Sequence, residues 1–351
     1  MQQLPEIDRD FLVSFLTGLL NTPSPTGFAE KAVDYTAEAL AAFDGFVMER
    51  TMKGALLATI SGETPAPARA LAAHADTLGA MVKEIKPNGR LRLTQIGGYP
   101  WSAIEGEGCT VFTSSGWQVQ GSILVESAST HVHGSRVVDE TKRSDANMEV
   151  RLDTRTTSEA ETRTLGIEVG DYIAFDPRVA VAEGYIRSRH LDNKAGVACI
   201  LTAVKALHDT NLKPHQKTYL FISNYEETGH GAASNLPDDI NELLVVDMAA
   251  VGEGQASDER SASICVKDSS GPYHHGLSQR LRKLAADYQL TTRVDIYNYY
   301  GSDGSSYWRA GGDAAVALIG PGIDASHSYE RTHLDSLAAT TQWILAYLLN
   351  E

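Results

Sequence analysis

The sequence predicts a three-layer α/β/α sandwich with a mixed, largely parallel sheet, interrupted by a small inserted β-rich domain. Short apolar runs alternate with segments of helical periodicity before residue 80 and again after residue 178. Between these positions, short alternating segments are divided by glycine-containing turns, and long helical patterns are absent. We therefore expect one α/β domain formed by residues 1–79 and 179–351, with residues 80–178 inserted as the β-rich domain.

The expected elements follow in order along the chain. The first part of the α/β domain carries two helical patterns joined by a turn-rich connection, and then two short apolar strands, at residues 8–20, 28–43, 55–60 and 70–75. The second part continues with alternating strands and helices. Its expected strands are 185–187, 218–224, 242–248, 262–267 and 314–319, and its expected helices are 193–208, 276–288 and 338–349.

The composition is that of a globular protein with an acidic surface. The chain has 351 residues, of which 42% are hydrophobic, and its formal net charge is −15. This charge argues against binding to nucleic acid phosphates or to anionic membranes, and no apolar run approaches the roughly 20 residues that span a bilayer. The first ten residues lack the basic region of a secretory signal, so we expect a cytoplasmic protein. The three cysteines are widely spaced and predict neither a disulfide framework nor a CxxC zinc site.

Two adjacent glutamates, Glu226 and Glu227, end the apolar run 218–225 and precede a glycine-containing turn. Neighbouring like charges resist joint ionisation, so two carboxylates at one strand end are unfavourable unless something offsets their charge. A cation bound by one glutamate would offset it and would leave the other glutamate free to accept a proton. The pair therefore predicts a metal site whose other ligands lie elsewhere in the chain.

His74 and Asp76 follow the apolar run 70–73, and alternate residues of an extended chain face the same side. His74 could bind a metal while Asp76 orients its imidazole ring, although a structural histidine beside a local aspartate gives the same pattern. Asp192 stands between an expected strand and an expected helix, where it could be a metal ligand or a helix N-cap. Sites in α/β sheets gather at the carboxyl ends of strands, which favours the ligand interpretation.

Asp247 and His327 complete the candidate set. Asp247 follows four apolar residues, where a carboxylate without a partner would be poorly solvated. His327 follows the expected strand 314–319, with His333 as a nearby competitor. Two histidines, two aspartates and one glutamate at successive strand ends suit two divalent ions that share an aspartate. Such paired ions can activate a bridging water and stabilise an oxyanion.

Five ordered motifs thus run along the chain: His74-Ala75-Asp76, Asp192-Asn193-Lys194-Ala195-Gly196, Glu226-Glu227-Thr228-Gly229, Asp247 and Ser326-His327-Ser328. Together they resemble metallopeptidase family forty-two, which contains the glutamyl and tetrahedral aminopeptidases. The resemblance implies that His74 and Asp247 bind one metal ion, that Glu227 and His327 bind the other, and that Asp192 bridges the two. It also implies that Glu226 is the general base and that Asp76 orients His74.

The resemblance further implies an aminopeptidase that removes N-terminal residues from peptides with two divalent ions per subunit. Zinc is the expected metal, and cobalt and manganese are the alternatives. Homo-oligomers are implied as well, with a dodecamer built from dimers as the expected form and the insertion as the oligomerisation domain.

Two residues are predicted to contact the substrate. Asp303, in the motif Gly301-Ser302-Asp303-Gly304, would meet the substrate amine, although a plain glycine-rich turn explains the same residues. His131, in the polar part of the insertion, would reach a neighbouring subunit's site, and solvent exposure is the competing interpretation.

The substrate itself has alternatives. Residues 129–131 and 324–326 depart from the common family pattern, and residues 248–255 resemble a branch found beside biosynthesis of the osmolyte N-acetylglutaminylglutamine amide. The alternative function is therefore a metal-dependent amidohydrolase or deacylase acting on an N-acylated, dipeptide-like osmolyte. Glycoside hydrolysis by Glu226 and a second acid would leave His74 and His327 unexplained. A non-catalytic metal-binding assembly protein is a further alternative.

Overall fold

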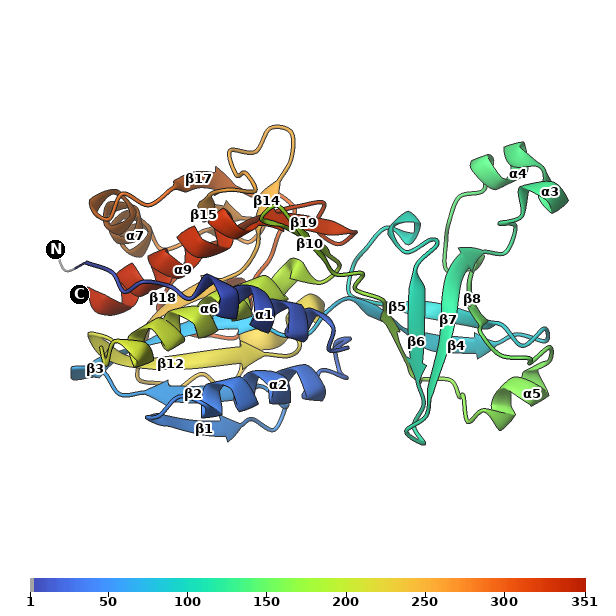
Figure 1. Cartoon of the computed structure of the whole chain (residues 1–351), viewed down its shortest axis with the longest axis horizontal. Coiled ribbons are helices and arrows are strands. Elements are labelled where there is room, and N and C mark those ends of the chain that lie inside the picture. Colours follow the sequence, from blue (N-terminus) through green and yellow to red (C-terminus); the bar gives the residue numbers. More distant parts are fainter. Residues whose placement is uncertain (1–2) are drawn as a thin grey trace. The chain divides into compact units, whose positions relative to one another are not determined.

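The computed structural model describes residues 3–351, which form two compact units (Figure 1). The larger unit combines the chain up to Asp76 with Arg178–Glu351, and the smaller unit is Thr77–Pro177. The insertion expected at residues 80–178 begins three residues later and ends one residue later than this smaller unit. Each unit has a hydrophobic core of its own.

The larger unit is built on a mixed sheet of 13 strands among the described residues, which confirms the predicted α/β class. Its central strands lie in the order β12, β3, β13, β18, and these neighbours pair in parallel. Antiparallel pairs flank them on both sides. The strands are β1 (Phe46–Arg50), β2 (Leu56–Ile60), β3 (Thr64–His74), β10 (Ala180–Ala182), β11 (Tyr185–Ser188), β12 (Gln216–Ser223), β13 (Ile240–Val246), β14 (Ala249–Val251), β15 (Ala262–Asp268), β16 (Gly271–Pro272), β17 (Thr292–Ile296), β18 (Ala315–Asp324) and β19 (Glu330–His333).

Both faces of this sheet are covered, because alternate side chains of the central strands enter two different cores. In β3, Leu71 and Ala73 pack into one core, whereas Ala70 and Ala72 pack into the other. The first core is closed by a layer that includes α6 and α9 (Figure 1), and the second by α8 with the short 3-10 turn η3. The helical elements are α1 (Arg9–Leu20), α2 (Glu30–Ala41), α6 (Leu191–Asp209), η2 (Glu226–Thr228), η3 (Gly231–Ala233), α7 (His275–Asp287), α8 (Asp303–Arg309) and α9 (Leu334–Leu349).

The smaller unit is a closed β-barrel with the strand order β4, β5, β8, β7, β6, β9. Its neighbouring strands pair antiparallel, and alternate residues such as Val111, Ile123 and Val150 fill its interior. The strands are β4 (Gly79–Ile85), β5 (Leu91–Ile96), β6 (Gly108–Phe112), β7 (Gln118–Val125), β8 (Met148–Leu152) and β9 (Tyr172–Phe175). Four short helical segments lie in the connections: η1 (Trp101–Ala103), α3 (Thr130–His133), α4 (Ser135–Glu140) and α5 (Glu159–Thr164).

Several elements differ from the sequence-based prediction. The sequence patterns do not predict β1 and β17, because these are edge strands whose side chains are mostly exposed. A helix, α8, begins at Asp303, so the glycine-rich motif is the start of a helix capped by Ser302 rather than a plain turn. The strand expected to end at residue 319 continues to Asp324, because β18 leaves β13 after Ile319 and pairs with β14.

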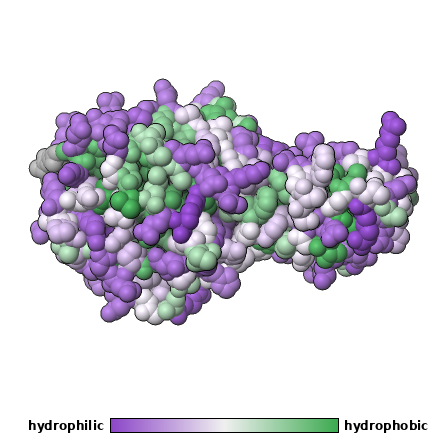
Figure 2. Space-filling view, turned by 90° about the horizontal axis from the view of Figure 1, so that it is seen from below, coloured by the Kyte–Doolittle hydropathy of each residue, from purple (hydrophilic) through white to green (hydrophobic). Residues whose placement is uncertain are grey.

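One face of the molecule is mainly polar. On the face shown in Figure 2, hydrophilic side chains surround separate apolar areas. Among residues 3–351, no helix combines the length and the hydropathy that crossing a membrane requires.

Candidate metal centre

The predicted ligands lie at one edge of the central sheet, because parallel strands end on the same side. His74 is the last residue of β3, and Asp247 directly follows β13. The register pairs His74 with Ser223, the last residue of β12, so the turn that carries Glu226 begins beside His74. The structure therefore explains why residues far apart in sequence converge here.

Asp192 reaches the same place through an irregular helix start. His190 occupies the N-cap position of α6 in a left-handed conformation, and Asp192 and Asn193 have non-helical backbone angles. Asn193 holds this start in place, since its side chain donates to the Val246 carbonyl of β13 at 2.8 Å and accepts from the Gly196 N–H at 3.1 Å. Asp192 is therefore not a helix cap, and its carboxylate is free to face the strand ends.

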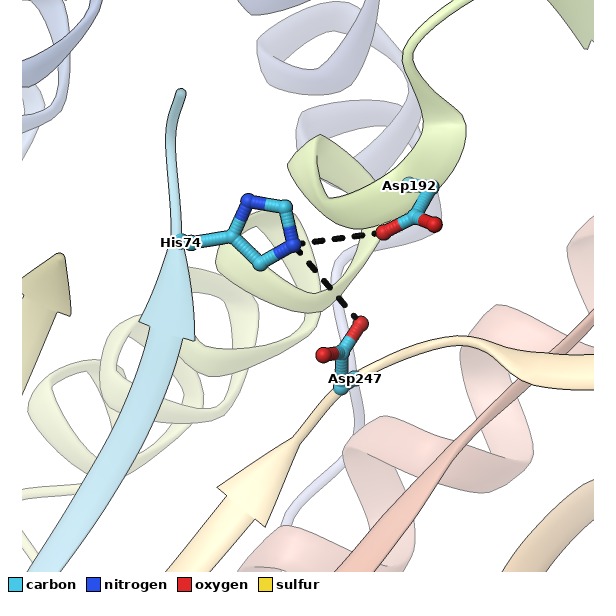
Figure 3. Close-up of side chains that lie close together, drawn as sticks. All are labelled: His74, Asp192 and Asp247. Atoms are coloured by element: carbon cyan, nitrogen blue, oxygen red, sulfur yellow. Dashed lines mark hydrogen bonds and ion pairs between the residues drawn. The ribbon is translucent and has the colours of Figure 1, made fainter. Parts of the chain in front are cut away.

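The first candidate ligand group contains His74, Asp192 and Asp247, all buried (Figure 3). His74 Nε2 lies 3.2 Å from Asp192 Oδ1 and 3.9 Å from Asp247 Oδ1. His74 Nδ1 lies 2.9 Å from the Asp76 carbonyl oxygen, which makes Nδ1 the donor and leaves Nε2 facing the carboxylates. Two donors bound tetrahedrally to one zinc ion at about 2.0–2.1 Å would stand roughly 3.4 Å apart, so this spacing suits a metal ion.

The second candidate group contains Asp192, Glu227 and His327. His327 Nε2 lies 3.4 Å from Asp192 Oδ2 and 3.7 Å from Glu227 Oε2. Within each group the possible ligand atoms lie within 4.8 Å of one another. Asp192 thus belongs to both groups and directs a different oxygen atom toward each histidine.

The electrostatics of these groups also suit a cation. Burial, together with the nearby Asp192 carboxylate, raises the pKa of Glu227 and of Asp247 to about 8. Burial would raise the pKa of Asp192 as well, but hydrogen bonds from His327 and His74 outweigh it and lower this pKa. These carboxyls retain their protons near neutral pH because they are buried and lie close to another carboxylate. A divalent ion can replace such protons. The residues therefore fit a metal by donor type, spacing and charge.

Glu226 belongs to neither ligand group, although it is the neighbour of Glu227. Its Oε2 lies 3.7 Å from His74 Nε2, beside the first group, and its side chain is 14% exposed. Burial raises its pKa well above the ordinary value, and Asp247 raises it further, against the opposing effect of His74. The 3-10 turn η2 therefore separates the two adjacent carboxylates, so that each faces a different group.

Asp76 does more than contact His74, the residue that it is predicted to orient. Its carboxylate accepts the Thr26 hydroxyl at 2.6 Å, the Glu226 N–H at 3.2 Å and the Glu227 N–H at 3.3 Å. The ring of His74 is closer to the Asp76 carbonyl than to its carboxylate, which lies 3.6 Å from Nδ1. The Asp76 carboxylate thus holds the backbone of the turn that carries both glutamates.

The remaining sequence-predicted residues have these positions. Asp303 is buried, and its carboxylate accepts the Ser223 hydroxyl at 2.6 Å and the Ala232 N–H at 2.7 Å. His131 is exposed on α3 of the smaller unit. Contact of either residue with a substrate stays a prediction. The competing histidine, His333, caps α9 through the Asp335 N–H.

Glu330 is a residue of this site that the sequence patterns do not predict. It is 2% exposed, and its two carboxylate oxygens accept the N–H groups of Asp192 and His327 at 3.1 and 3.0 Å. Burial, together with the nearby Asp192 carboxylate, raises its pKa to about 8. The only available signal is an acidic residue three positions after a candidate ligand.

Comparison with known proteins adds evidence about the whole chain. The family described as "M42 glutamyl aminopeptidase" matches residues 54–343. "Putative aminopeptidase YhfE" of Bacillus subtilis (strain 168) is 45% identical over 331 residues, which cover 94% of this chain and 95% of that protein.

Solved structures share the fold. The TET aminopeptidase of the archaeon Thaumarchaeota SCGC AB-539-E09 superposes with a TM-score of 0.86 at 18% identity, covering 97% of this chain and 96% of that chain. The TET1 peptidase of Pyrococcus horikoshii gives a TM-score of 0.84 at 21% identity, covering 97% and 100%. At such identities the likeness establishes the fold alone.

Proposed function

The chain belongs to the M42 glutamyl aminopeptidase family, and from this premise we propose that it is an aminopeptidase with a dinuclear metal site. As a member of this peptidase family, it is a hydrolase that cleaves peptide bonds. One observation carries the dinuclear part of the proposal: Asp192 directs Oδ1 toward His74 and Oδ2 toward His327. A carboxylate placed in this way can bridge two ions.

His74 and Asp247 would hold one ion, Glu227 and His327 would hold the other, and Asp192 would belong to both. When bound, two divalent ions supply an activated water and a Lewis acid for the peptide carbonyl. Nitrogen and oxygen donors suit zinc, which we propose as the metal, with cobalt and manganese as alternatives.

Glu226 is the proposed general base. It lies beside the ligand groups without belonging to either, and its raised pKa suits a carboxylate that must hold a proton between two transfers. Its Oε atoms take the proton from the attacking water and deliver it to the nitrogen of the leaving amine. The N–H of Glu226 is fixed by Asp76, so the base is held by a buried acceptor.

The charge around the site favours a peptide with a free amino terminus. Besides the ligands, the carboxylates of Asp76, Glu226, Asp303 and Glu330 lie in or against this region. In their ionised forms these carboxylates attract an ammonium group more than a neutral acylated nitrogen. N-terminal peptide bonds are therefore the proposed substrate class, ahead of N-acylated dipeptide-like osmolytes.

We also propose that the chain is a cytoplasmic homo-oligomer, a dodecamer built from dimers. The TET1 peptidase of Pyrococcus horikoshii assembles into a tetrahedron or a large octahedral shell. In the smaller unit, Trp117 and Val132 are 71% and 74% exposed, which offers apolar surface for self-association.

The proposed chemistry is tested by Glu226→Gln. The variant should bind both ions as the wild type does and should lose nearly all hydrolysis of aminoacyl amides, because glutamine cannot accept the proton. Metal content and turnover are measured on the same metal-reconstituted sample. Glu38→Gln, an exposed position on α2, is the matched control and should keep wild-type turnover. Wild-type turnover in Glu226→Gln would remove Glu226 as the base.

A substrate panel tests the free-amine proposal separately. Each aminoacyl or dipeptidyl amide is compared with its N-acetylated form at equal concentration. We expect the free amines to be hydrolysed and the acetylated forms to resist. A preference for the acetylated forms would replace the aminopeptidase with the deacylase alternative.

A further inference from the structure

Glu330 connects two backbone segments that each carry a candidate metal ligand. Its Oε2 accepts the Asp192 N–H at 3.1 Å, and its Oε1 accepts the His327 N–H at 3.0 Å. Glu330 opens β19, where pairing with Ser188 of β11 fixes its own backbone. One buried carboxylate therefore ties the helix start that carries Asp192 to the loop that carries His327.

The backbone of both segments needs such support. His327 has a φ of +63° and His190, two residues before Asp192, has a φ of +73°. Residues other than glycine rarely adopt this left-handed backbone conformation. It persists where the surrounding structure holds the backbone in place. Each hydrogen bond to Glu330 lies at or near one of these positions. Loss of the carboxylate would release the His327 loop, whereas Asn193 would still hold the helix start that carries Asp192.

The two ligand groups depend on Glu330 unequally. Asp192 and His327 are two of the three members of the second group, and the third, Glu227, is fixed through Asp76. In the first group, His74 and Asp247 sit at the ends of central strands, and only Asp192 touches Glu330. Movement of the His327 loop would thus separate His327 from Asp192, while the first group stayed in place.

We propose that Glu330 is a positioning residue for the second metal ion, because it sets the distance between Asp192 and His327. The inference rests on the proposed dinuclear site and adds to it a residue that binds neither metal nor substrate. It assigns the second ion, bound through Asp192, Glu227 and His327, as the one whose affinity depends on Glu330.

The test is a titration of metal-free protein with CoCl₂ alone, followed by visible absorption and by metal content after desalting. Wild type should take up two ions, and His327→Ala, which lacks a ligand of the second group, should define the one-ion spectrum. Glu330→Gln should bind one ion with wild-type affinity and the other about 10–100-fold more weakly, the range expected when a group that orients a ligand is lost. Glu330→Asp keeps the charge but is one methylene shorter, so it should show the same selective loss.

Glu242→Gln is the matched control, because Glu242 is a poorly exposed carboxylate of the same unit that pairs with Arg69 and Arg280. It should lower the unfolding temperature and leave both cobalt affinities unchanged. If Glu330→Gln bound both ions with wild-type affinity, or lost affinity for both ions equally, the proposed role of Glu330 would be wrong. The dinuclear proposal would not be affected by that result. A wild-type protein that takes up a single ion would overturn the dinuclear proposal and this inference with it.

Discussion

The carboxylate of Asp76 accepts the backbone N–H of Glu226 at 3.2 Å, across 150 residues of sequence. The same carboxylate accepts the next N–H, that of Glu227. A single side chain at the end of β3 therefore fixes the turn after β12 that carries the candidate base and a candidate ligand. Under the proposed roles, metal binding by Glu227 and proton transfer by Glu226 would both depend on this buried acceptor.

Asp76→Asn should lower turnover by about one to two orders of magnitude. The amide keeps one acceptor oxygen and directs an NH₂ group at a backbone donor, and an unsatisfied buried donor costs about 1–3 kcal/mol. We expect kcat to fall more than KM rises, because the turn carries the proposed base, Glu226. Steady-state kinetics with metal-reconstituted protein measures the effect. Asp239→Asn, which removes an exposed partner of Lys217, is the control, and equal kinetic losses in both variants would contradict this prediction.

Metal affinity should rise with pH between about 6 and 8. The carboxyls of Glu227 and Asp247 have a pKa of about 8 in the folded metal-free protein, because they are buried near Asp192. A divalent ion needs these oxygens deprotonated, so affinity should increase by up to about tenfold per pH unit for each displaced proton. The pKa of His74 is also raised, despite burial, by hydrogen bonds to Asp192 and Asp76, which acts in the same direction. Calorimetric titration in two buffers of different ionisation enthalpy measures both the affinity and the protons released.

The carboxyls of Glu227 and Asp247 also determine how the stability of the metal-free protein changes with pH. Unfolded aspartate and glutamate lose their protons above about pH 4, whereas the folded protein keeps these two protons up to about pH 8. The free energy of unfolding of the metal-free protein should therefore fall as pH rises through this interval and then level off. Saturating metal should remove this dependence. A metal affinity that does not change between pH 6 and 8 would contradict both expectations.

Part of the candidate ligand set is predictable from sequence because those members stand at the ends of strongly apolar strands. His74, Asp247 and the glutamate pair all follow buried runs whose periodicity identifies parallel strands. Glu330 cannot be predicted in this way, since its role depends on a left-handed loop at His327 and on pairing between β11 and β19. Neither feature leaves a periodic pattern in the sequence.

The fold, like the site, is only partly predictable from the sequence. The alternating strands and helices predict the α/β class, and the change of texture after residue 80 predicts a separate β-rich insertion. Edge strands such as β17 are missed because their exposed side chains lack an apolar run. The extension of β18 through Gly320 and Gly322 is missed because glycine and proline usually end a strand, whereas here a Cβ at Gly320 would lie 1.5 Å from the Asp247 carbonyl oxygen.

Gly231→Ala should impair the connection between β12 and β13, where it packs against α8. A Cβ at this position would lie 1.8 Å from Asp303 Oδ1, so the carboxylate would have to leave Ser223 and Ala232. We expect a loss of about 1–3 kcal/mol in stability and lower turnover, since the displaced segment carries Glu226. Thermal unfolding and kinetics measure the two effects. Gly252→Ala, where no heavy atom lies within 4 Å of the added carbon, should match the wild type, and a neutral Gly231→Ala would show that Asp303 does not hold this segment.

Arg69→Met should destabilise the larger unit without weakening metal binding. Arg69 is 2% exposed on β3, its Nε lies 3.2 Å from Glu242 Oε2, and its Nη1 donates to the Tyr347 carbonyl at 2.9 Å near the end of α9. Loss of one partner from a buried ion pair costs about 3–5 kcal/mol, and we expect the lower end because Arg280 still pairs with Glu242. Urea unfolding measures the change. Arg50→Met, at a more exposed ion pair with Asp34, should cost at most about 1 kcal/mol. Equal losses of stability at the two positions would show that burial of the Arg69 pair does not stabilise the contact between the sheet and α9. A loss of cobalt affinity in Arg69→Met would show that the metal ligands depend on this remote part of β3.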